Sequence, residues 1–488
     1  MPAEKGPLVL GIDLGTSAVK VVALDGHGIV LGTGTAPFPT HSEVPAQAEQ
    51  DPADWIAAVA AAMADLDLPA PQRSRIAGIG LTAQLPTLVC LGAAGPLGRA
   101  ITWKDSRADG STAEALVEGQ RRVEGQRRAL YERTGMPIDG RYLGPMFRHH
   151  WRHRFTEIDA VLSAKDYLAF VLTGERVTDP STAAGYGVYD LAAGAYSDEL
   201  RELWGIPRGA LPAVRPAHSA AGTLSATGTR LLGVPAGVAV TVGAADSVSS
   251  AFAMAGLEEG VVCITMGSST VILDALREPK LDPQTRYLLT PHVEPGWYGR
   301  EMDLLATGTG YRWLSGLLGL REGQLDEYAA ESPPGARGVT FAPYLAGGEQ
   351  GALWDPSLRG SLSGLTLQHT SRDLARAFLE GVGFEIRRCL DVLADTVPTR
   401  EVVLAGHLTE HASSLQMLAD ILDQPIQPVP AGSPAAVGAA LGALQCVTSV
   451  PQVPRSRTSW PAEVLPGRDA GAYRGLYAAY LEQAGKSC

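Results

Sequence analysis

The chain has 488 residues, of which 45% are hydrophobic and 19% are charged. A chain of this length exceeds one hydrophobic core, so we expect two domains of roughly 200 to 250 residues each. Forty basic against 52 acidic residues give a formal net charge of -12, which argues against nucleic acid or an anionic membrane as the main partner. The N-terminus lacks an apolar signal core and no apolar run reaches membrane-spanning length, so a cytoplasmic protein is expected.

Cysteine and histidine usage gives no sign of a disulfide framework or a zinc site. The five cysteines are scattered, odd in number and not closely paired. His149, His150 and His153 lie close together, but the arginines among them oppose the binding of a metal cation. We therefore expect a solvated basic surface there rather than a metal cluster.

Residues 8–24 form the first informative pattern, which is an apolar strand, a short polar turn and a second apolar strand. Gly15 lets the backbone of the turn approach a ligand closely, and successive N–H groups of such a turn surround an anion. Thr16 and Ser17 add hydroxyl donors to the same turn. The turn is therefore predicted to bind phosphate.

Two charged residues flank this turn. Lys20 can supply a cation, and Asp13, at the end of the first strand, is placed to hold Mg²⁺ directly or through water. The pattern continues with the hairpin signal Asp25-Gly26 and a strand from about 28 to 35, not with the helix that follows dinucleotide and Walker-type loops. An ordinary apolar hairpin whose aspartate caps a turn would give the same pattern.

The first half continues with an alternation of helices and buried strands. Apolar residues recur every fourth position over 53–66, which predicts a helix, and short strands are expected over 75–81 and 87–91. Gln84 and Leu85 lie between these strands, in a polar interruption at a strand end. Ligand-binding side chains are often placed at such positions.

Two further groups in this half are candidates for chemistry. Trp103, Lys104 and Asp105 form a dense aromatic and charged group, which by itself is also typical of a surface salt-bridge cluster. A buried strand over 237–242 leads to Asp246, and strand ends of this kind carry catalytic groups in α/β sheets. The alternative role of Asp246 is to cap the following helix.

The opening pattern returns in the second half of the chain. Residues 261–274 contain a strand, a turn with Gly267, Ser268 and Ser269, and another strand. The two turns are 252 positions apart, about half the chain (267 minus 15). Two such hairpins predict a duplicated α/β fold whose domains hold the phosphates of a nucleotide between them.

These patterns divide the chain into two domains and a tail. The expected ranges are 1–256, 257–450 and 451–488, with the tail packed on the surface. In the second domain Gly308 lies in a glycine-rich turn entering a helix, and Gly406 follows a strand. Further helices are expected over 371–393, 414–422 and 433–442, and the turn over 178–182 belongs to the first domain.

Together these motifs resemble the FGGY family of carbohydrate kinases, and within it the xylulokinase branch most closely. The matching stretches cover nearly the whole chain and are Gly11-Ile-Asp-Leu-Gly-Thr-Ser17, Ala48-Glu-Gln-Asp-Pro52, Trp103-Lys-Asp-Ser-Arg107, Gly243-Ala-Ala-Asp246, Tyr344-Leu-Ala-Gly347 with Trp354-Asp-Pro356, and Gly360 to Thr370. The resemblance implies a duplicated actin-like ATPase (ribonuclease H-like) α/β fold. Its two domains enclose a central cleft where sugar and ATP meet.

The resemblance also implies roles for individual residues. Asp246 corresponds to the catalytic base and Asp13 to the carboxylate associated with Mg²⁺ and phosphate. The residues implied to bind ATP and its phosphates are Gly15, Thr16, Ser17, Lys20, Gly267, Ser268, Ser269, Gly308 and Gly406. The residues implied to border the sugar, in the N-terminal domain, are Gln84, Leu85, Trp103, Lys104, Asp105 and Asp246.

Several positions depart from the xylulokinase pattern. Xylulokinases usually have Gln-Met-His at Gln84-Leu85-Pro86, and asparagine at the positions of Lys104 and Ser247. Because lost hydrogen bonds at a polar site change discrimination strongly, these departures leave the sugar open. Lys104 either favours an acceptor with a negative group or points to solvent. On the nucleotide side, Ala405-Gly406-His407-Leu408 keeps one clear glycine where the family usually has two or three.

The main hypothesis is an ATP- and Mg²⁺-dependent kinase of a ketose, polyol or related sugar-like alcohol, with Asp246 as the base. The second hypothesis is a catalytically weak family member that acts as a sugar- or nucleotide-responsive binding protein, because the Gly406 loop and the sugar pocket are altered. The expected partner is a small sugar or polyol, with neither nucleic acid nor membrane. Dimers are common in the family, so the resemblance adds a homodimer as an expectation.

Overall fold

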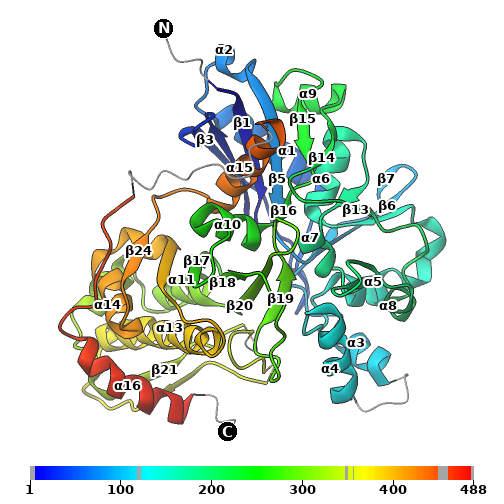
Figure 1. The fold of residues 1–488 in the computed structure, drawn as a ribbon. Helices are drawn as coiled ribbons and strands as arrows, with labels where there is room; N and C mark the ends of the chain where they lie inside the picture. Colours follow the sequence, from blue (N-terminus) through cyan, green and yellow to red (C-terminus); the bar gives the residue numbers. More distant parts are fainter. Residues whose placement is uncertain are drawn as a thin grey trace.

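Two large sheets, each from one half of the chain, form the centre of the molecule (Figure 1). The computed structural model describes residues 6–117, 123–321, 323–346, 350–355, 357–448 and 460–484. Parts of the predicted motifs, Gly347, Gly348 and Pro356, lie outside these residues. Helices pack around both sheets, so the molecule has the layered α/β architecture that the sequence predicts.

The first sheet is built on the predicted hairpin. Its first two strands pair antiparallel, and the next strand extends the hairpin as the Asp25-Gly26 signal predicts. A later strand pairs parallel to the first one. The sheet order is β14-β15-β5-β1-β2-β3, with β16 beside β5. The strands are β1 (Leu8–Leu14), β2 (Ala18–Leu24), β3 (Val30–Pro37), β5 (Ile76–Ala83), β14 (Ala220–Thr223), β15 (Ala239–Thr241) and β16 (Ala244–Ala245).

The second sheet repeats this arrangement, which confirms the predicted duplication. An antiparallel hairpin is again followed by a parallel neighbour from much later in the chain. The sheet order is β19-β20-β18-β17-β23-β24. Its strands are β17 (Val261–Met266), β18 (Thr270–Leu276), β19 (Leu288–Pro291), β20 (Tyr298–Leu304), β23 (Glu401–Gly406) and β24 (Ile426–Pro428).

A smaller lobe of the first domain lies at the lower right of Figure 1, where α3, α4, α5 and α8 are labelled. It has its own hydrophobic core, which includes the fully buried Phe147, Tyr186 and Trp204. Its strands are β4 (Glu49–Gln50), β6 (Thr87–Gly92), β7 (Gly95–Pro96), β8 (Ala100–Thr102) and β9 (Ala160–Leu162). Its helices include α3 (Asp109–Val117), α4 (Val123–Thr134), α5 (Leu143–His150) and α8 (Asp198–Trp204).

The predicted helices are present, with small differences at their ends. They are α1 (Pro52–Asp65), α11 (Thr307–Leu317), α13 (Ser371–Ala394), α14 (Ala412–Leu422) and α15 (Pro434–Thr448), and a further helix, α6 (Ala164–Thr173), belongs to the first domain. The capping box of Thr370 and Asp373 begins α13. The expected turn over 178–182 was wrong, because Asp179 accepts hydrogen bonds from two backbone N–H groups and starts the short helix α7 (Pro180–Ala184).

Two helices are exchanged between the halves of the chain. α15, from the second half, packs on β1 and β5 of the first sheet, whereas α10 (Asp246–Ala255) packs on β17 and β18 of the second (Figure 1). The two helices also pack on each other. A Cβ atom at Gly80 would lie 1.8 Å from the Ala439 carbonyl oxygen, and one at Gly438 would lie 1.9 Å from that of Ser249. Glycine at these positions therefore permits contact between backbones.

The last described helix, α16 (Ala470–Gln483), lies against α14 and α13. Its tyrosines carry this contact: the Tyr473 hydroxyl donates to Glu380 over 2.8 Å and the Tyr480 hydroxyl to Glu385 over 2.7 Å. Residues 449–459, the proline-rich part of the tail, lie outside the described residues. The aromatic end of the chain thus contributes to the core of the second domain.

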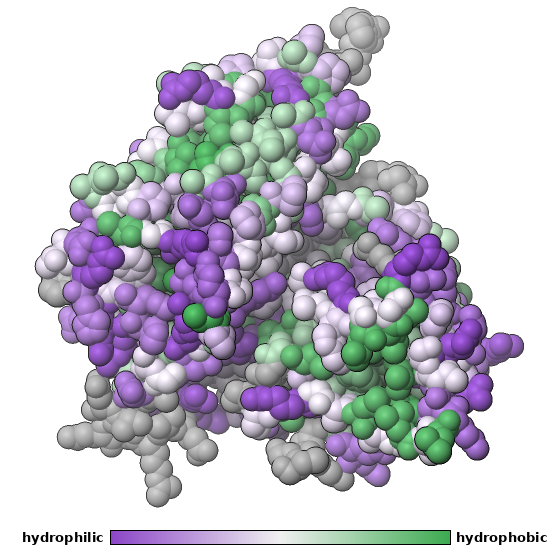
Figure 2. Space-filling view, turned by 180° about the vertical axis from the view of Figure 1, so that it is seen from behind, coloured by the Kyte–Doolittle hydropathy of each residue, from purple (hydrophilic) through white to green (hydrophobic). Residues whose placement is uncertain are grey.

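The surface carries both hydrophilic and hydrophobic residues. Figure 2 shows hydrophilic residues over the middle left of the face seen from behind, with hydrophobic residues gathered in its upper part and at its lower right. Over the described ranges no helix is both long and apolar enough to cross a membrane. Nor do three or more His, Cys, Asp or Glu side chains from that part of the chain form a group that could hold a metal ion.

The contact between α10 and α15 yields a stability prediction. Gly438→Ala places a methyl group against the Ser249 carbonyl, so we expect the free energy of unfolding to fall by about 1–3 kcal/mol. Gly475→Ala, in the exposed face of α16 with no atom within 4 Å of the new Cβ, should raise it by about 0.5–1 kcal/mol. Urea unfolding of both variants measures the difference. Equal stability of the two variants would contradict the close packing.

Candidate active site

A cavity of about 130 Å³ lies between the two domains. Both predicted phosphate-binding turns reach it, the first through Thr16 and the second through Ser269. Asp246, at the start of α10, lies in the same lining. Leu85 and Trp103, two of the residues predicted to border the sugar, also line it from the first domain. The structure therefore brings together residues that are far apart in the sequence.

Asp13 lies at the end of β1, directly opposite Lys20 in the hairpin. One carboxylate oxygen, Oδ2, accepts a hydrogen bond of 3.0 Å from the Ser433 hydroxyl at the start of α15. The other oxygen, Oδ1, is buried and has no hydrogen-bond partner in the described part of the chain. Burial raises the pKa of Asp13, although Lys20 and Ser433 act in the opposite direction. A buried oxygen without a partner is suited to Mg²⁺ or to one of its waters.

The first turn is held rigidly by its surroundings. The Gly15 N–H closes the turn by donating to the Ala18 carbonyl over 3.1 Å. The Gln50 amide donates to the Thr16 carbonyl over 2.8 Å, and the Trp103 indole donates to the Thr16 hydroxyl over 3.3 Å. The side chains of Ser17 and Lys20 are exposed. The turn thus presents groups that a phosphate can reach.

The second turn has a matching bond, because the Gly267 N–H donates to the Ser269 carbonyl over 2.8 Å. Two predicted nucleotide-side glycines pack against this turn and the strand before it. A Cβ atom at Gly308 would lie 2.0 Å from the Gly267 carbonyl oxygen, and one at Gly406 would lie 2.0 Å from that of Met266. Gly406 also has a φ of 115°, which disfavours other residues.

A second, mostly apolar pocket adjoins this turn in the second domain. It is lined by Tyr311 of α11 together with His407 and Leu408, which follow β23. The rings of His407 and Tyr311 are in contact, with centroids 5.4 Å apart, and burial lowers the pKa of His407. The side chains that replace the family's glycines therefore form part of the pocket wall.

Asp246 is the first residue of α10, and the residue that occupies the cap position is Ala245. The Asp246 Oδ1 atom accepts a hydrogen bond of 3.0 Å from the Ser247 N–H. Burial, with a further contribution from the nearby Asp13, raises the pKa of Asp246 to about 8. When it is ionised, a carboxylate with a raised pKa is a stronger base than an aspartate with an ordinary pKa.

Gln84 is placed behind the first turn rather than in the lining of the cavity. Its side chain is buried, and its amide donates to Gln50 Oε1 over 2.7 Å. Gln50 in turn holds the Thr16 carbonyl and accepts from the Trp55 indole. Gln84 therefore supports the residue that fixes the first turn.

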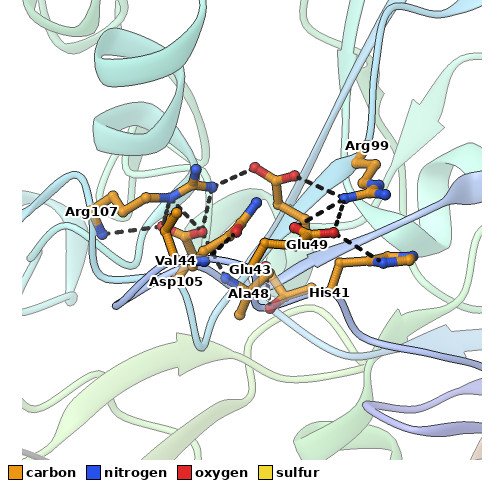
Figure 3. A network of polar contacts seen from close by, with 10 residues as sticks. His41, Glu43, Val44, Ala48, Glu49, Arg99, Asp105 and Arg107 are labelled. Carbon is orange, nitrogen blue, oxygen red and sulfur yellow. Dashed lines mark hydrogen bonds and ion pairs between the residues drawn. The ribbon is translucent and has the colours of Figure 1, made fainter.

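Asp105 is also committed to the scaffold (Figure 3). It accepts a hydrogen bond of 2.9 Å from the Ala48 N–H and forms an ion pair of 2.6 Å with Arg107, which also contacts Glu49. Its neighbour Lys104 lies over the Trp103 ring, 5.2 Å from the centroid, and lines a wider outer cleft. Burial and the nearby Arg312 lower the pKa of Lys104.

Three charged residues of the cavity were missed by the sequence reasoning. Glu301 and Asp303 enter it from β20, and Arg141 enters from the lobe of the first domain. The Ser247 hydroxyl donates to Glu301 over 2.7 Å. Burial raises the pKa of Asp303 to about 7 and that of Glu301 well above its ordinary value, with repulsion between the two carboxylates contributing for Glu301. The alternation of acidic residues along this strand was the available signal.

Comparison with known proteins agrees with this geometry. The xylulose kinase of Escherichia coli is 29% identical, with 96% of this chain and 98% of the relative covered. The glycerol kinase of Thermococcus gammatolerans is also 29% identical, with 97% and 96% covered. The crystal structure of xylulose kinase from Rhodospirillum rubrum is 30% identical and covers 97% of this chain and 98% of its own, with a TM-score of 0.82.

The two domains match one family separately. Residues 8–253 match the N-terminal domain of the FGGY family of carbohydrate kinases, and residues 262–446 match its C-terminal domain. The predicted two-domain, actin-like ATPase fold is confirmed by these matches and by the solved structure. The chain therefore belongs to the FGGY family of carbohydrate kinases and is a sugar kinase of that family.

Proposed function

We propose that the protein transfers the γ-phosphate of ATP to a hydroxyl group of a ketose, a polyol or a related sugar-like alcohol. The observation that carries this proposal is the shared cavity, in which Asp246 lies with Thr16 of the first turn and Ser269 of the second. Phosphoryl transfer depends mainly on positioning and on charge neutralisation. A base between two phosphate-binding turns is arranged for both.

Each group in the cavity has a separate task in this proposal. The N–H and hydroxyl groups of the two turns bind the phosphates of ATP, with Lys20 near the first turn. Asp13 would hold Mg²⁺, which neutralises phosphate charge when it is bound. Asp246 accepts a hydrogen bond from the attacking hydroxyl, orients it, and takes its proton as the oxygen–phosphorus bond forms.

The side chains around the base limit the acceptor. Leu85 and Pro86 lie in the cavity where xylulokinases usually have a methionine and a histidine, and Ser247 lies there where they usually have an asparagine. The relatives include enzymes named for glycerol as well as for xylulose. We therefore propose the class of sugar-like alcohols rather than one member of it.

The role of Asp246 is tested by an ADP-release screen with Mg·ATP against ketoses, polyols and cyclitols. Asp246→Asn removes the proton acceptor while nearly preserving shape, so we expect kcat to fall by about 10²–10⁴-fold for the acceptor found. Asp198→Asn, an exposed carboxylate of α8, is the matched control and should keep full activity. Turnover by Asp246→Asn at the rate of the control would refute Asp246 as the base. Ligand binding without turnover by the wild type would favour the binding-protein alternative.

The pH dependence provides a separate test. With a pKa of about 8, Asp246 is mostly protonated below that pH and cannot accept the hydroxyl proton. The value of kcat/KM, measured with limiting acceptor, should therefore rise about tenfold per unit below pH 8 and level off above it. A profile that stays flat from pH 6 to 9 would show that no such carboxylate controls the rate.

A further inference from the structure

One wall of the cavity is acidic. Among the described residues that line it, the carboxylates are Asp246, Glu301 and Asp303, and the one cationic side chain is Arg141. Arg141 is already paired with Asp139 at 2.6 Å. The lining therefore holds three carboxyl groups against one cation, and because burial raises the pKa of each of them, their negative charge develops fully only at alkaline pH.

The acidic residues of β20 are not needed to build the sheet. This strand is paired on both sides, with β18 and β19, so its backbone bonds are satisfied without them. Alternate residues of a strand point to opposite faces, and the intervening Met302 is fully buried in the hydrophobic core. Burying a charged group costs free energy unless a partner compensates for it. The two carboxylates call for an explanation in terms of what the cavity binds.

Both carboxylates have acceptor capacity left. Over the described part of the chain, the Asp303 carboxylate has neither a hydrogen bond nor an ion pair, although the charge of the nearby Arg141 acts to lower its pKa. Glu301 accepts one hydrogen bond, from the Ser247 hydroxyl, whereas a carboxylate can accept about four. Hydroxyl groups of a bound acceptor are the donors that this wall lacks.

The same cavity also has apolar lining residues. They are Leu85, Pro86, Trp103 and Met136 of the first domain. A polyol or ketose has both kinds of surface, since its C–H groups suit an apolar wall and its hydroxyls suit carboxylates. The cavity offers partners for both, since its lining contains apolar side chains as well as carboxyl groups.

We propose that Glu301 and Asp303 determine the class of acceptor, by forming hydrogen bonds with hydroxyls of an uncharged polyol or ketose and, when they are ionised, by repelling acceptors that carry a carboxylate. This inference rests on the proposed kinase function and specifies its substrate. Like charges brought together in a cavity reject a ligand more strongly than a missing contact does. The cation of Lys104 does not offset this effect, because it lines the outer cleft.

The test compares each neutral polyol with the aldonate of the same carbon number, using xylitol with xylonate and glucitol with gluconate. For the wild type at alkaline pH, where more of the two carboxyl groups are ionised, kcat/KM should favour the neutral partner by at least about 100-fold. Glu301→Gln with Asp303→Asn removes the charges and keeps the shapes, so this preference should fall by about tenfold or more. Asp303→Asn alone leaves the bond between Ser247 and Glu301 intact, and covers the case in which the double variant does not fold. Asp198→Asn should leave the preference unchanged.

The outcomes separate this inference from the proposed function. Efficient turnover of an aldonate by the wild type would overturn the inference and leave the kinase function standing. A preference unaffected in folded Asp303→Asn and in the double variant would also overturn it. Failure of every acceptor, neutral or acidic, would refute the proposed function and the inference together.

Discussion

The packing of α10 against α15 is the contact on which the rest of the site depends. Each helix lies on the sheet of the other half of the chain, and Gly438 lets their backbones touch. The first residue of α10 is Asp246, and Ser433, just before α15, holds the Asp13 carboxylate. The same interface therefore joins the domains and places the proposed base beside the proposed magnesium ligand.

The hairpins, the duplication and the long helices could be predicted, because they follow from local patterns such as β-branched runs, the Asp25-Gly26 turn and the capping box of α13. The exchange of α10 and α15 could not, since nothing local distinguishes a helix that packs on its own sheet. The roles of Gln84 and Asp105 show a related limit: a polar residue near a binding loop can bind the ligand or support the loop. Here both hold scaffold partners, Gln50 and Arg107.

Glu301 and Asp303 illustrate what only the fold supplies. Their strand pairs with β18 and β19, which precede it closely in the chain, but the cavity that the two residues enter is completed by residues distant in the sequence, such as Leu85 and Trp103. In the folded protein, Glu301 and Asp303 join Asp246 in one cavity, so that the site holds three carboxyl groups. Carboxylates withdrawn from water, Asp246 among them, act more strongly on hydroxyls than they do in solvent. The domain boundary proposed near 256–260 lies directly after the helix that carries this base.

In the proposed reaction, a phosphoryl group passes from ATP to a carbon-bound hydroxyl. The most direct measurement is ³¹P NMR of a reaction that contains Mg·ATP, the protein and a mixture of ketoses and polyols. We expect the γ-phosphate signal to be replaced by a phosphomonoester signal that is split by coupling to protons on the acceptor carbon. Unchanged ATP, or inorganic phosphate as the sole new signal, would contradict the proposed reaction.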